Sequence, residues 1–190
     1  MVDKVLKSSK LTLYYTDQLT WKKSEFQTLM KYLEPTLQVL EKFVCGKGDE
    51  QLGLKSHVEV QLTLCGDRKI RTLNKDYRGK DKATDVLSFP VHDSLRRGER
   101  DDEFLFDVLN IGDIIISRDV ARRQAKDFEI SLPQETVHLI VHGFLHLCGY
   151  DHELSKEEHE LMFGIEQKLV ASIYKKLGLK GKVYSYGTES

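Results

Sequence analysis

Polar and apolar residues alternate along several short stretches of the chain, and a period of two predicts β-strands. The clearest stretch is 57–64, in which every second residue is apolar. Residues 10–15 alternate at first and are rich in strand-forming residues. Residues 111–116 contain a β-branched run that is typical of a buried strand. A short strand is predicted over 84–90, where Pro90 ends it.

Other stretches carry apolar residues at steps of three and four, which predicts amphipathic helices. The two clearest are 21–44 and 67–77, and Pro35 is expected to kink or divide the first of them. Ser117 or Asp119 is expected to cap a third helix. Two capping boxes predict the starts of two more helices. These boxes are Ser131-Leu-Pro-Gln134 and Ser155-Lys-Glu-Glu158.

The remaining stretches carry no regular period. Residues 46–53 are polar and contain glycine, which is typical of a loop. Residues 92–108 are charged and irregular, and we assign them no function. Because strands and helices are mixed, with no repeat and no linker, we predict an α+β fold with a small mixed β-sheet packed against several helices. Residues 1–178 are expected to form a single domain, and residues 179–190 a weakly ordered tail.

Composition narrows the class of protein. The chain has 190 residues and a formal net charge of −1, which argues against a uniformly basic protein that coats nucleic acid. Cys45, Cys65 and Cys148 form no paired motif, as is typical of a reducing compartment. No apolar run approaches the ~18–20 residues that span a bilayer. The start of the chain is too polar for a secretory signal, so a cytoplasmic protein with no membrane contact is expected.

The strongest chemical signal is the stretch His142-Gly-Phe-Leu-His-Leu-Cys-Gly-Tyr-Asp-His152. On a helix, His142 and His146 lie one turn apart on the same face. Gly149 can end that helix in the left-handed conformation and turn the chain back, so that His152 joins them. Three nitrogen ligands leave one tetrahedral position open, which is typical of a catalytic zinc site. We therefore predict a metal site on this helix and turn, near the C-terminal third, with Cys148 pointing away from it as a core thiol.

The same spacing occurs in zinc peptidases of the zincin type, whose pattern is H-x-x-x-H-x-x-G-x-x-H. In those enzymes a glutamate follows the first histidine and serves as the general base. Gly143 takes that position in this chain. A peptidase is therefore a rival hypothesis that lacks its proton acceptor.

A basic loop, Tyr77-Arg-Gly-Lys-Asp-Lys82, offers a second half for such a site. Arg78, Lys80 and Lys82 suit a phosphate better than a peptide, because arginine can bind two phosphate oxygens at once. Taken alone, the loop is best explained as a solvated charged turn. Together with a metal ion, it indicates metal-assisted hydrolysis of a phosphodiester.

Other histidines and aspartates near these motifs have weaker cases. His138 lies one turn before the first histidine of the motif and is best explained by packing, with a lesser case for a role in the site. Asp151 is expected either to orient a ligand imidazole or to bond to its own turn. Asp113 lies in the middle of a predicted strand and could face the cleft, but we assign it no role. His57 and His159 are expected at the surface.

Three blocks of the sequence stand out when they are taken together. They are Tyr77-Arg-Gly-Lys-Asp-Lys-Ala-Thr-Asp-Val-Leu-Ser-Phe-Pro90, Ile111-Gly-Asp-Ile-Ile-Ile-Ser117 and the histidine motif 142–152. In this order they resemble the YbeY family of metal-dependent endoribonucleases. The resemblance implies one α+β domain and one Zn²⁺ per chain, held by His142, His146 and His152. It also implies a catalytic arginine in the cleft, which corresponds to Arg78.

The function that this resemblance implies is cleavage of single-stranded RNA, in 3′-end maturation of small-subunit ribosomal RNA and in ribosome quality control. The implied partners are that ribosomal RNA, together with small-subunit ribosomal proteins or a ribosome-associated GTPase. A second rival hypothesis is a non-catalytic ribosome assembly factor with a structural metal, which the near-neutral charge slightly favours.

Two chemical questions stay open at the level of sequence. Three histidines also accept nickel, cobalt or copper, so the identity of the ion is not determined. The nucleophile is either a zinc-bound hydroxide or the RNA 2′-hydroxyl. A 2′,3′-cyclic phosphate product would indicate the second route, and a plain 5′-phosphate the first.

Overall fold

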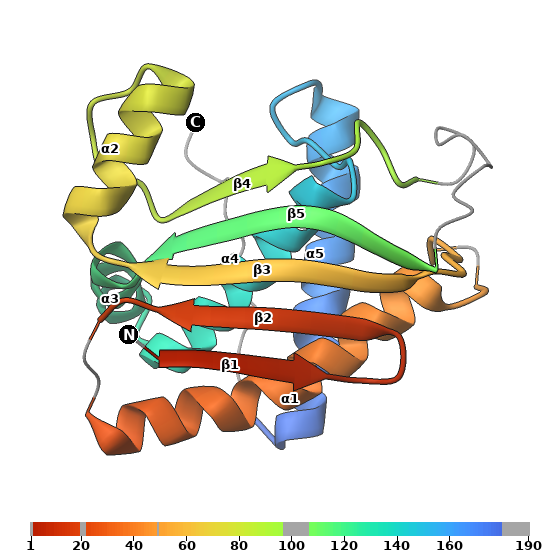
Figure 1. Ribbon diagram of the computed structural model, residues 1–190, viewed down its shortest axis with the longest axis horizontal. Coiled ribbons are helices and arrows are strands. Elements are labelled where there is room, and N and C mark those ends of the chain that lie inside the picture. The colour runs from red at the N-terminus through yellow and green to blue at the C-terminus, as the bar shows by residue number, and fades with distance from the viewer. Residues whose placement is uncertain (1, 20–21, 49, 97–106, 180–190) are drawn as a thin grey trace.

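The computed structural model describes residues 2–19, 22–48, 50–96 and 107–179. The strands within these residues are β1 (Val2–Lys7), β2 (Leu11–Asp17), β3 (His57–Cys65), β4 (Val86–Pro90) and β5 (Val108–Ser117). They form one mixed sheet in the order β1-β2-β3-β5-β4 (Figure 1). β2, β3 and β5 run parallel, whereas β1 and β4 pair antiparallel at the two edges.

The helices lie mainly on one side of this sheet. Their bounds are Lys23–Cys45 for α1, Asp67–Arg78 for α2, Arg118–Asp127 for α3, Leu132–Leu147 for α4 and Lys156–Leu177 for α5. α1 and α4 pack on one face of the sheet and α5 packs on both of them, behind the strands in Figure 1. We call the opposite face of the sheet the open face. Within the described residues, the cover on this face lies at its end beside β4, where Ile70 of α2 packs against Cys65 and Leu87.

Strand β3 shows why the core lies under the helices. Its apolar side chains Val58, Val60, Leu62 and Leu64 are buried, and the polar residues between them stay partly exposed on the open face. Burying each such side chain stabilises the fold by roughly 1.5–3 kcal/mol. The alternation predicted for residues 57–64 is therefore confirmed.

The α+β fold with a small mixed sheet is confirmed, and the predicted strands correspond to β2, β3, β4 and β5. Ser117 is the cap of α3, because its side chain accepts a hydrogen bond from the Val120 N–H at 3.2 Å. α1 continues through Pro35 as one helix, so the helix is not divided there. β1 was not predicted, because Lys4 and Lys7 give its sequence a polar character.

Parts of two predicted irregular segments lie outside the described residues. These parts are residues 97–106 of the charged stretch and residues 180–190 of the expected tail. The end of the charged stretch is a strand, because β5 begins at Val108 rather than at Ile111. Among the described residues, no helix is both long and apolar enough to cross a membrane.

A bulge in β5 brings its glycine against β4. The pairing of β3 with β5 shifts register between Glu59 and Val60, next to Gly112. Gly112 has φ +128°, and a Cβ added to it would lie 2.2 Å from the carbonyl oxygen of Phe89. Only glycine fits a position that combines this backbone conformation with so close a contact.

Gly112→Ala is expected to lower the free energy of unfolding by about 2 kcal/mol or more, because it adds backbone strain and an atomic overlap. Gly164→Ala in α5 is the matched control, since nothing lies within 4 Å of its added Cβ. There we expect stabilisation by about 0.5–1 kcal/mol, because alanine is favoured in helices. Urea unfolding followed by circular dichroism measures both variants. Similar small changes in the free energy of unfolding for both substitutions would contradict the requirement for glycine at position 112.

Candidate metal centre

Helix α4 carries the first two histidines of the motif, and its start is fixed locally. The Ser131 hydroxyl accepts a hydrogen bond from the Gln134 N–H, and the Gln134 side chain accepts one from the Ser131 N–H, as the predicted capping box requires. Most of the helix is buried, including Val141 and Phe144. The core therefore sets the rotation of α4 about its axis, and with it the direction in which its histidines point.

The third histidine arrives through the turn that follows α4. The helix ends at Leu147, and Gly149 has φ +91°, which confirms the left-handed glycine predicted from the spacing. A Cβ at Gly149 would lie 2.7 Å from Ser94 Oγ and 2.8 Å from Ser94 Cα. The turn is also held by a hydrogen bond from the Leu95 N–H to the Cys148 carbonyl at 3.1 Å. A neighbouring segment thus packs tightly around the turn that delivers His152.

Residues 92–96, which sequence analysis assigned no function, therefore have a structural role. Arg96 makes two hydrogen bonds to the carboxylate of Glu158, at 2.9 and 3.2 Å. Its guanidinium also lies 4.9 Å from the ring centroid of Tyr150. These contacts join the segment after β4 to the first turn of α5 and to Tyr150 in the α4–α5 connection, which carries His152.

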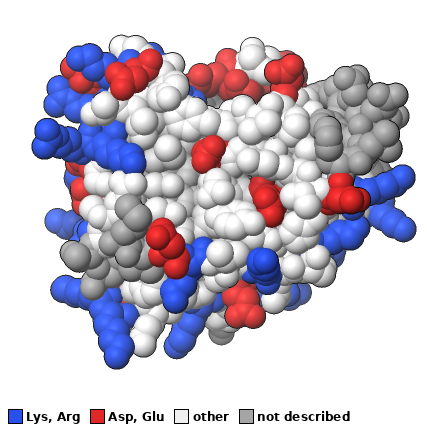
Figure 2. Space-filling model, viewed as in Figure 1, with Lys and Arg blue, Asp and Glu red and all other residues white. Residues whose placement is uncertain are grey.

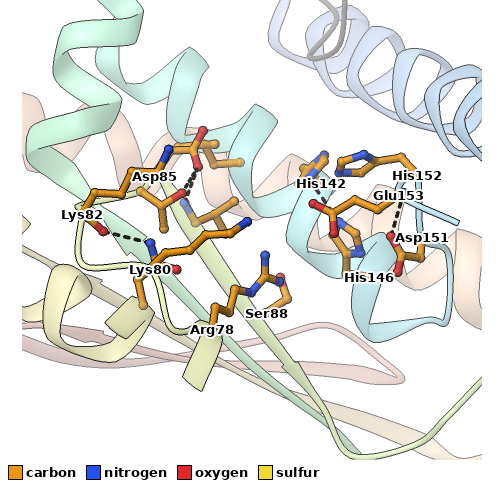
Figure 3. Close-up of a pocket in the computed structure, with 14 residues that line it drawn as sticks. Arg78, Lys80, Lys82, Asp85, Ser88, His142, His146, Asp151, His152 and Glu153 are labelled. Atoms are coloured by element: carbon orange, nitrogen blue, oxygen red, sulfur yellow. Dashed lines mark hydrogen bonds between the residues drawn. The ribbon is translucent and has the colours of Figure 1, made fainter. Parts of the chain in front are cut away.

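The three imidazoles converge on one point (Figure 3). One ligand nitrogen from each of His142, His146 and His152 can be chosen so that all lie within 4.8 Å of one another. The Nε2 atoms of His142 and His146 are 3.2 Å apart. Two nitrogens bound to one tetrahedral zinc at the usual bond length lie about 3.3 Å apart. The donor set and its spacing therefore fit a single zinc ion.

A buried carboxylate orients the first histidine. Glu166 of α5 is only 4% exposed, and its Oε2 accepts a hydrogen bond from His142 Nδ1 at 3.0 Å. A ring that donates through Nδ1 presents the lone pair of Nε2, which is the atom facing His146. No local sequence pattern marks Glu166 as part of the site. The aspartate considered for such a role, Asp151, instead accepts a hydrogen bond from the Glu153 N–H at 2.9 Å, as a turn aspartate does.

The electrostatic surroundings favour neutral, metal-binding imidazoles. Burial, together with the neighbouring His142 and His152, lowers the pKa of His146 to about 4. Burial and the nearby His142 also lower the pKa of His152. A neutral ring carries the free lone pair that a metal ion needs, so His146 is available as a ligand at neutral pH.

A cavity of about 350 Å³ joins the histidines to the basic loop. All three histidines line it, and Arg78, Lys80 and Lys82 line the opposite side (Figure 3). In the part of the chain that the structure describes, none of these three cations forms an ion pair. By contrast, Arg71 and Lys75 on the adjoining helix are both paired with Asp81. The positive charge beside the histidines is therefore available to an anionic ligand.

Gly143 lies where α4 packs on the sheet. A Cβ at this position would lie 2.9 Å from Ile114 Cγ2 and 3.0 Å from Ser88 Oγ. Strand residues thus fill the space that a side chain at position 143 would need. The glutamate that serves as general base in a zincin peptidase would have to push these two side chains aside, which weakens the peptidase hypothesis further.

The weaker candidates from the sequence lie mostly outside the cavity. His138 is fully buried and hydrogen bonds to the Tyr174 hydroxyl at 2.9 Å, which fits the packing interpretation. Cys148 is also fully buried, as expected of a core thiol.

The structure also locates Asp113, to which no role was assigned, and it corrects the expected surface positions of His57 and His159. Asp113 is exposed on the open face and does not line the cavity. His57 is half-buried and hydrogen bonds to Thr12 Oγ1 at 2.7 Å, so it is not an ordinary surface residue. His159 is also half-buried, and its ring centroid lies 6.1 Å from that of His152.

Glu166→Gln is expected to weaken zinc binding by about 10- to 100-fold, because the amide holds the His142 ring less firmly and makes it a poorer donor. Competition with a chromophoric chelator measures the zinc affinity directly, without reference to catalysis. Glu160→Gln, on the exposed side of the same helix, is the matched control and should leave the affinity within about twofold. Equal affinities of the wild type and Glu166→Gln would show that the carboxylate does not support the site.

One solved structure resembles the fold described above. The solution structure of TM1509 from Thermotoga maritima matches with a TM-score of 0.52 and covers 87% of this chain and 91% of that chain. The sequence identity is 24%, so this likeness shows the fold alone.

Proteins more similar in sequence identify the family. A protein from Aquifex aeolicus named endoribonuclease YbeY is 43% identical over 126 residues, which are 66% of this chain and 77% of the relative. One of the same name from Bacillus velezensis is 40% identical over 136 residues, 70% of this chain and 83% of the relative. The family model described as Endoribonuclease YbeY matches residues 22–174. The enzyme class and the family indicated by the motifs are thereby confirmed, and the chain belongs to the endoribonuclease YbeY family.

Proposed function

We propose that this protein is a zinc-dependent, single-strand-specific endoribonuclease of the cytoplasm. Its proposed role is in 3′-end maturation of small-subunit ribosomal RNA and in ribosome quality control. The observation that supports this proposal best is the shared cavity, which has three convergent imidazoles on one side and the cationic side chains of Arg78, Lys80 and Lys82 on the other. Membership in an endoribonuclease family makes an RNA phosphodiester the ligand that suits both sides.

Each part of the cavity has its own task in this proposal. His142, His146 and His152 would hold the metal ion, and Glu166 keeps the first of them in the required orientation. Zinc bound there would polarise a phosphoryl oxygen and lower the pKa of a bound water from 15.7 to about 7.

Arg78 supplies the contact with the scissile phosphate. It is the last residue of α2, and the left-handed Gly79 directly after it turns the chain into the basic loop. Its planar guanidinium can bind two non-bridging oxygens at once. Cleavage passes through a phosphorane-like arrangement in which negative charge gathers on these oxygens, so the interaction strengthens as the reaction proceeds. Lys80 and Lys82 add positive charge along the same wall for the adjoining phosphates.

Two of the carboxylates that line the cavity, Asp85 and Asp151, already accept hydrogen bonds from the protein. Asp85 accepts hydrogen bonds from the Gln124 side chain and from the Val86 N–H, both at 2.8 Å. Asp151 is engaged in its own turn. Water and the RNA 2′-hydroxyl therefore both remain candidate nucleophiles, and the chemistry of the product ends, analysed by mass spectrometry, distinguishes them.

The distribution of charge bears on the proposed partners. The net charge of −1 gives little general attraction to RNA, and lysine and arginine side chains gather over α2 (Figure 2). Local contacts of this kind suit delivery of the substrate by other components. Small-subunit ribosomal proteins or a ribosome-associated GTPase are the partners that we propose for this step.

Arg78→Ala is expected to retain one zinc per chain and to lose about 10²- to 10³-fold in cleavage rate, because it removes a charged contact that strengthens in the transition state. Arg78→Lys keeps the charge without the planar fork, so its cleavage rate should lie between those of the wild type and Arg78→Ala. The measurement is cleavage of a single-stranded oligoribonucleotide, with the metal content determined by mass spectrometry.

Two further variants complete this experiment. Arg122→Ala removes an exposed arginine that does not line the cavity and should cleave at the wild-type rate. His146→Ala should lose both the metal and the activity. Full activity of Arg78→Ala would remove that residue from the mechanism, and a zinc-loaded wild type that never cuts RNA would favour the assembly-factor alternative.

A further inference from the structure

An aromatic pair lies beside the cavity without lining it. Tyr77, in the last turn of α2, is 69% exposed. Its ring meets that of Phe89 in β4 edge to face, with the centroids 5.0 Å apart and an interplanar angle of 71°. Phe89 thus supports the Tyr77 ring from one side while much of that ring stays open to solvent.

Each member of the pair is next in sequence to a residue that lines the cavity. Tyr77 precedes Arg78, and Phe89 follows Ser88. Successive side chains in a strand point to opposite faces, so Phe89 lies on the open face while Ser88 points towards α4. Consecutive Cα atoms are about 3.8 Å apart. A strand of RNA that leaves the cavity across β4 would therefore meet this aromatic pair at once.

The position of β4 leaves that path open. β4 is the edge strand of the sheet, and it ends at Pro90, which has no N–H to donate to a further strand. Within the described residues no strand pairs with its outer side. An extended ligand can therefore cross this edge without displacing any of the described strands.

Charge separates the surroundings of the pair into two regions. Arg78 and Lys80 lie on the α2 side, where positive side chains gather in Figure 2. Asp113 on β5 is the direct cross-strand partner of Phe89, and Glu59 lies beyond it on β3, both on the open face. A phosphate backbone is attracted to the first region and repelled by the second, whereas an uncharged base can occupy the aromatic surface between them.

We propose that Tyr77, supported by Phe89, is a stacking site for the unpaired nucleobase next to the scissile phosphate. This inference rests on the proposed function and deepens it. A base within a duplex is stacked on both sides and paired at its edge, so it cannot lie on the Tyr77 ring without being unstacked. The site would thereby supply a physical reason for a preference for single strands.

The test measures binding of a fluorescent, non-cleavable 2′-O-methyl oligoribonucleotide to the zinc-loaded protein by anisotropy. Tyr77→Ala is expected to raise the Kd by about 5- to 150-fold, which corresponds to one stacked base. Tyr77→Trp should restore tight binding, and its indole emission should be quenched by the RNA. Val5→Ala, an exposed apolar residue on the opposite edge strand, is the control and should leave the Kd unchanged.

A series of oligonucleotides with one abasic position separates stacking from a general effect on the fold. At one position, removal of the base should weaken binding to the wild type but cause no further loss in Tyr77→Ala. If Tyr77→Ala raised the Kd by the same factor for every oligonucleotide in the series, the stacking site would be wrong.

The result for Arg78→Ala separates failure of the stacking site from failure of the proposed function. If Arg78→Ala weakens binding and Tyr77→Ala does not, the stacking site is wrong and the proposed function stands. If neither variant changes binding, and Arg78→Ala also cleaves at the full rate, both fail.

Discussion

The close packing of α4 on β4 and β5 is the constraint on which the site depends. At Gly143 an added Cβ would lie only 2.9 Å from Ile114 Cγ2, and the neighbouring Val141 and Phe144 are fully buried. A helix held in this way cannot rotate, because a shift of one residue turns it by about 100° and would carry His142 and His146 towards the core. The same packing places these histidines above the edge of the sheet, where β4 and the basic loop before it form the other wall of the cavity.

The fold could be predicted from the sequence wherever an element carries its own pattern. β3 alternates and α4 begins with a capping box, so each is specified by residues close together in the chain. β1 is different, because a sequence with Lys4 and Lys7 becomes a strand by pairing with β2. The order of the strands depends likewise on contacts between distant segments, which a single sequence does not reveal.

The residues of the candidate site fall into the same two groups, those that a local sequence pattern predicts and those that only tertiary packing brings in. The three histidines fall within eleven residues, so local helix geometry was enough to bring them together. Glu166 lies on another helix and reaches His142 only through tertiary packing, and no local signal marks it. Asp113 was considered for the cleft because the three isoleucines after it hide which face of the strand is buried. The bulge at Gly112 also shifts the alternation of buried and exposed residues along the strand.

The turn at Gly149 makes the position of His152, one of the three candidate ligands, dependent on residues 94–96, which do not line the cavity. Ser94 and Leu95 hold that turn from outside, and Arg96 ties the same stretch to Glu158. Insertions or deletions between β4 and β5 would then act at a distance, by moving His152 away from the other two candidate ligands. A nuclease impaired by such a change in length would be deficient in its metal, even though every residue that faces the RNA was intact.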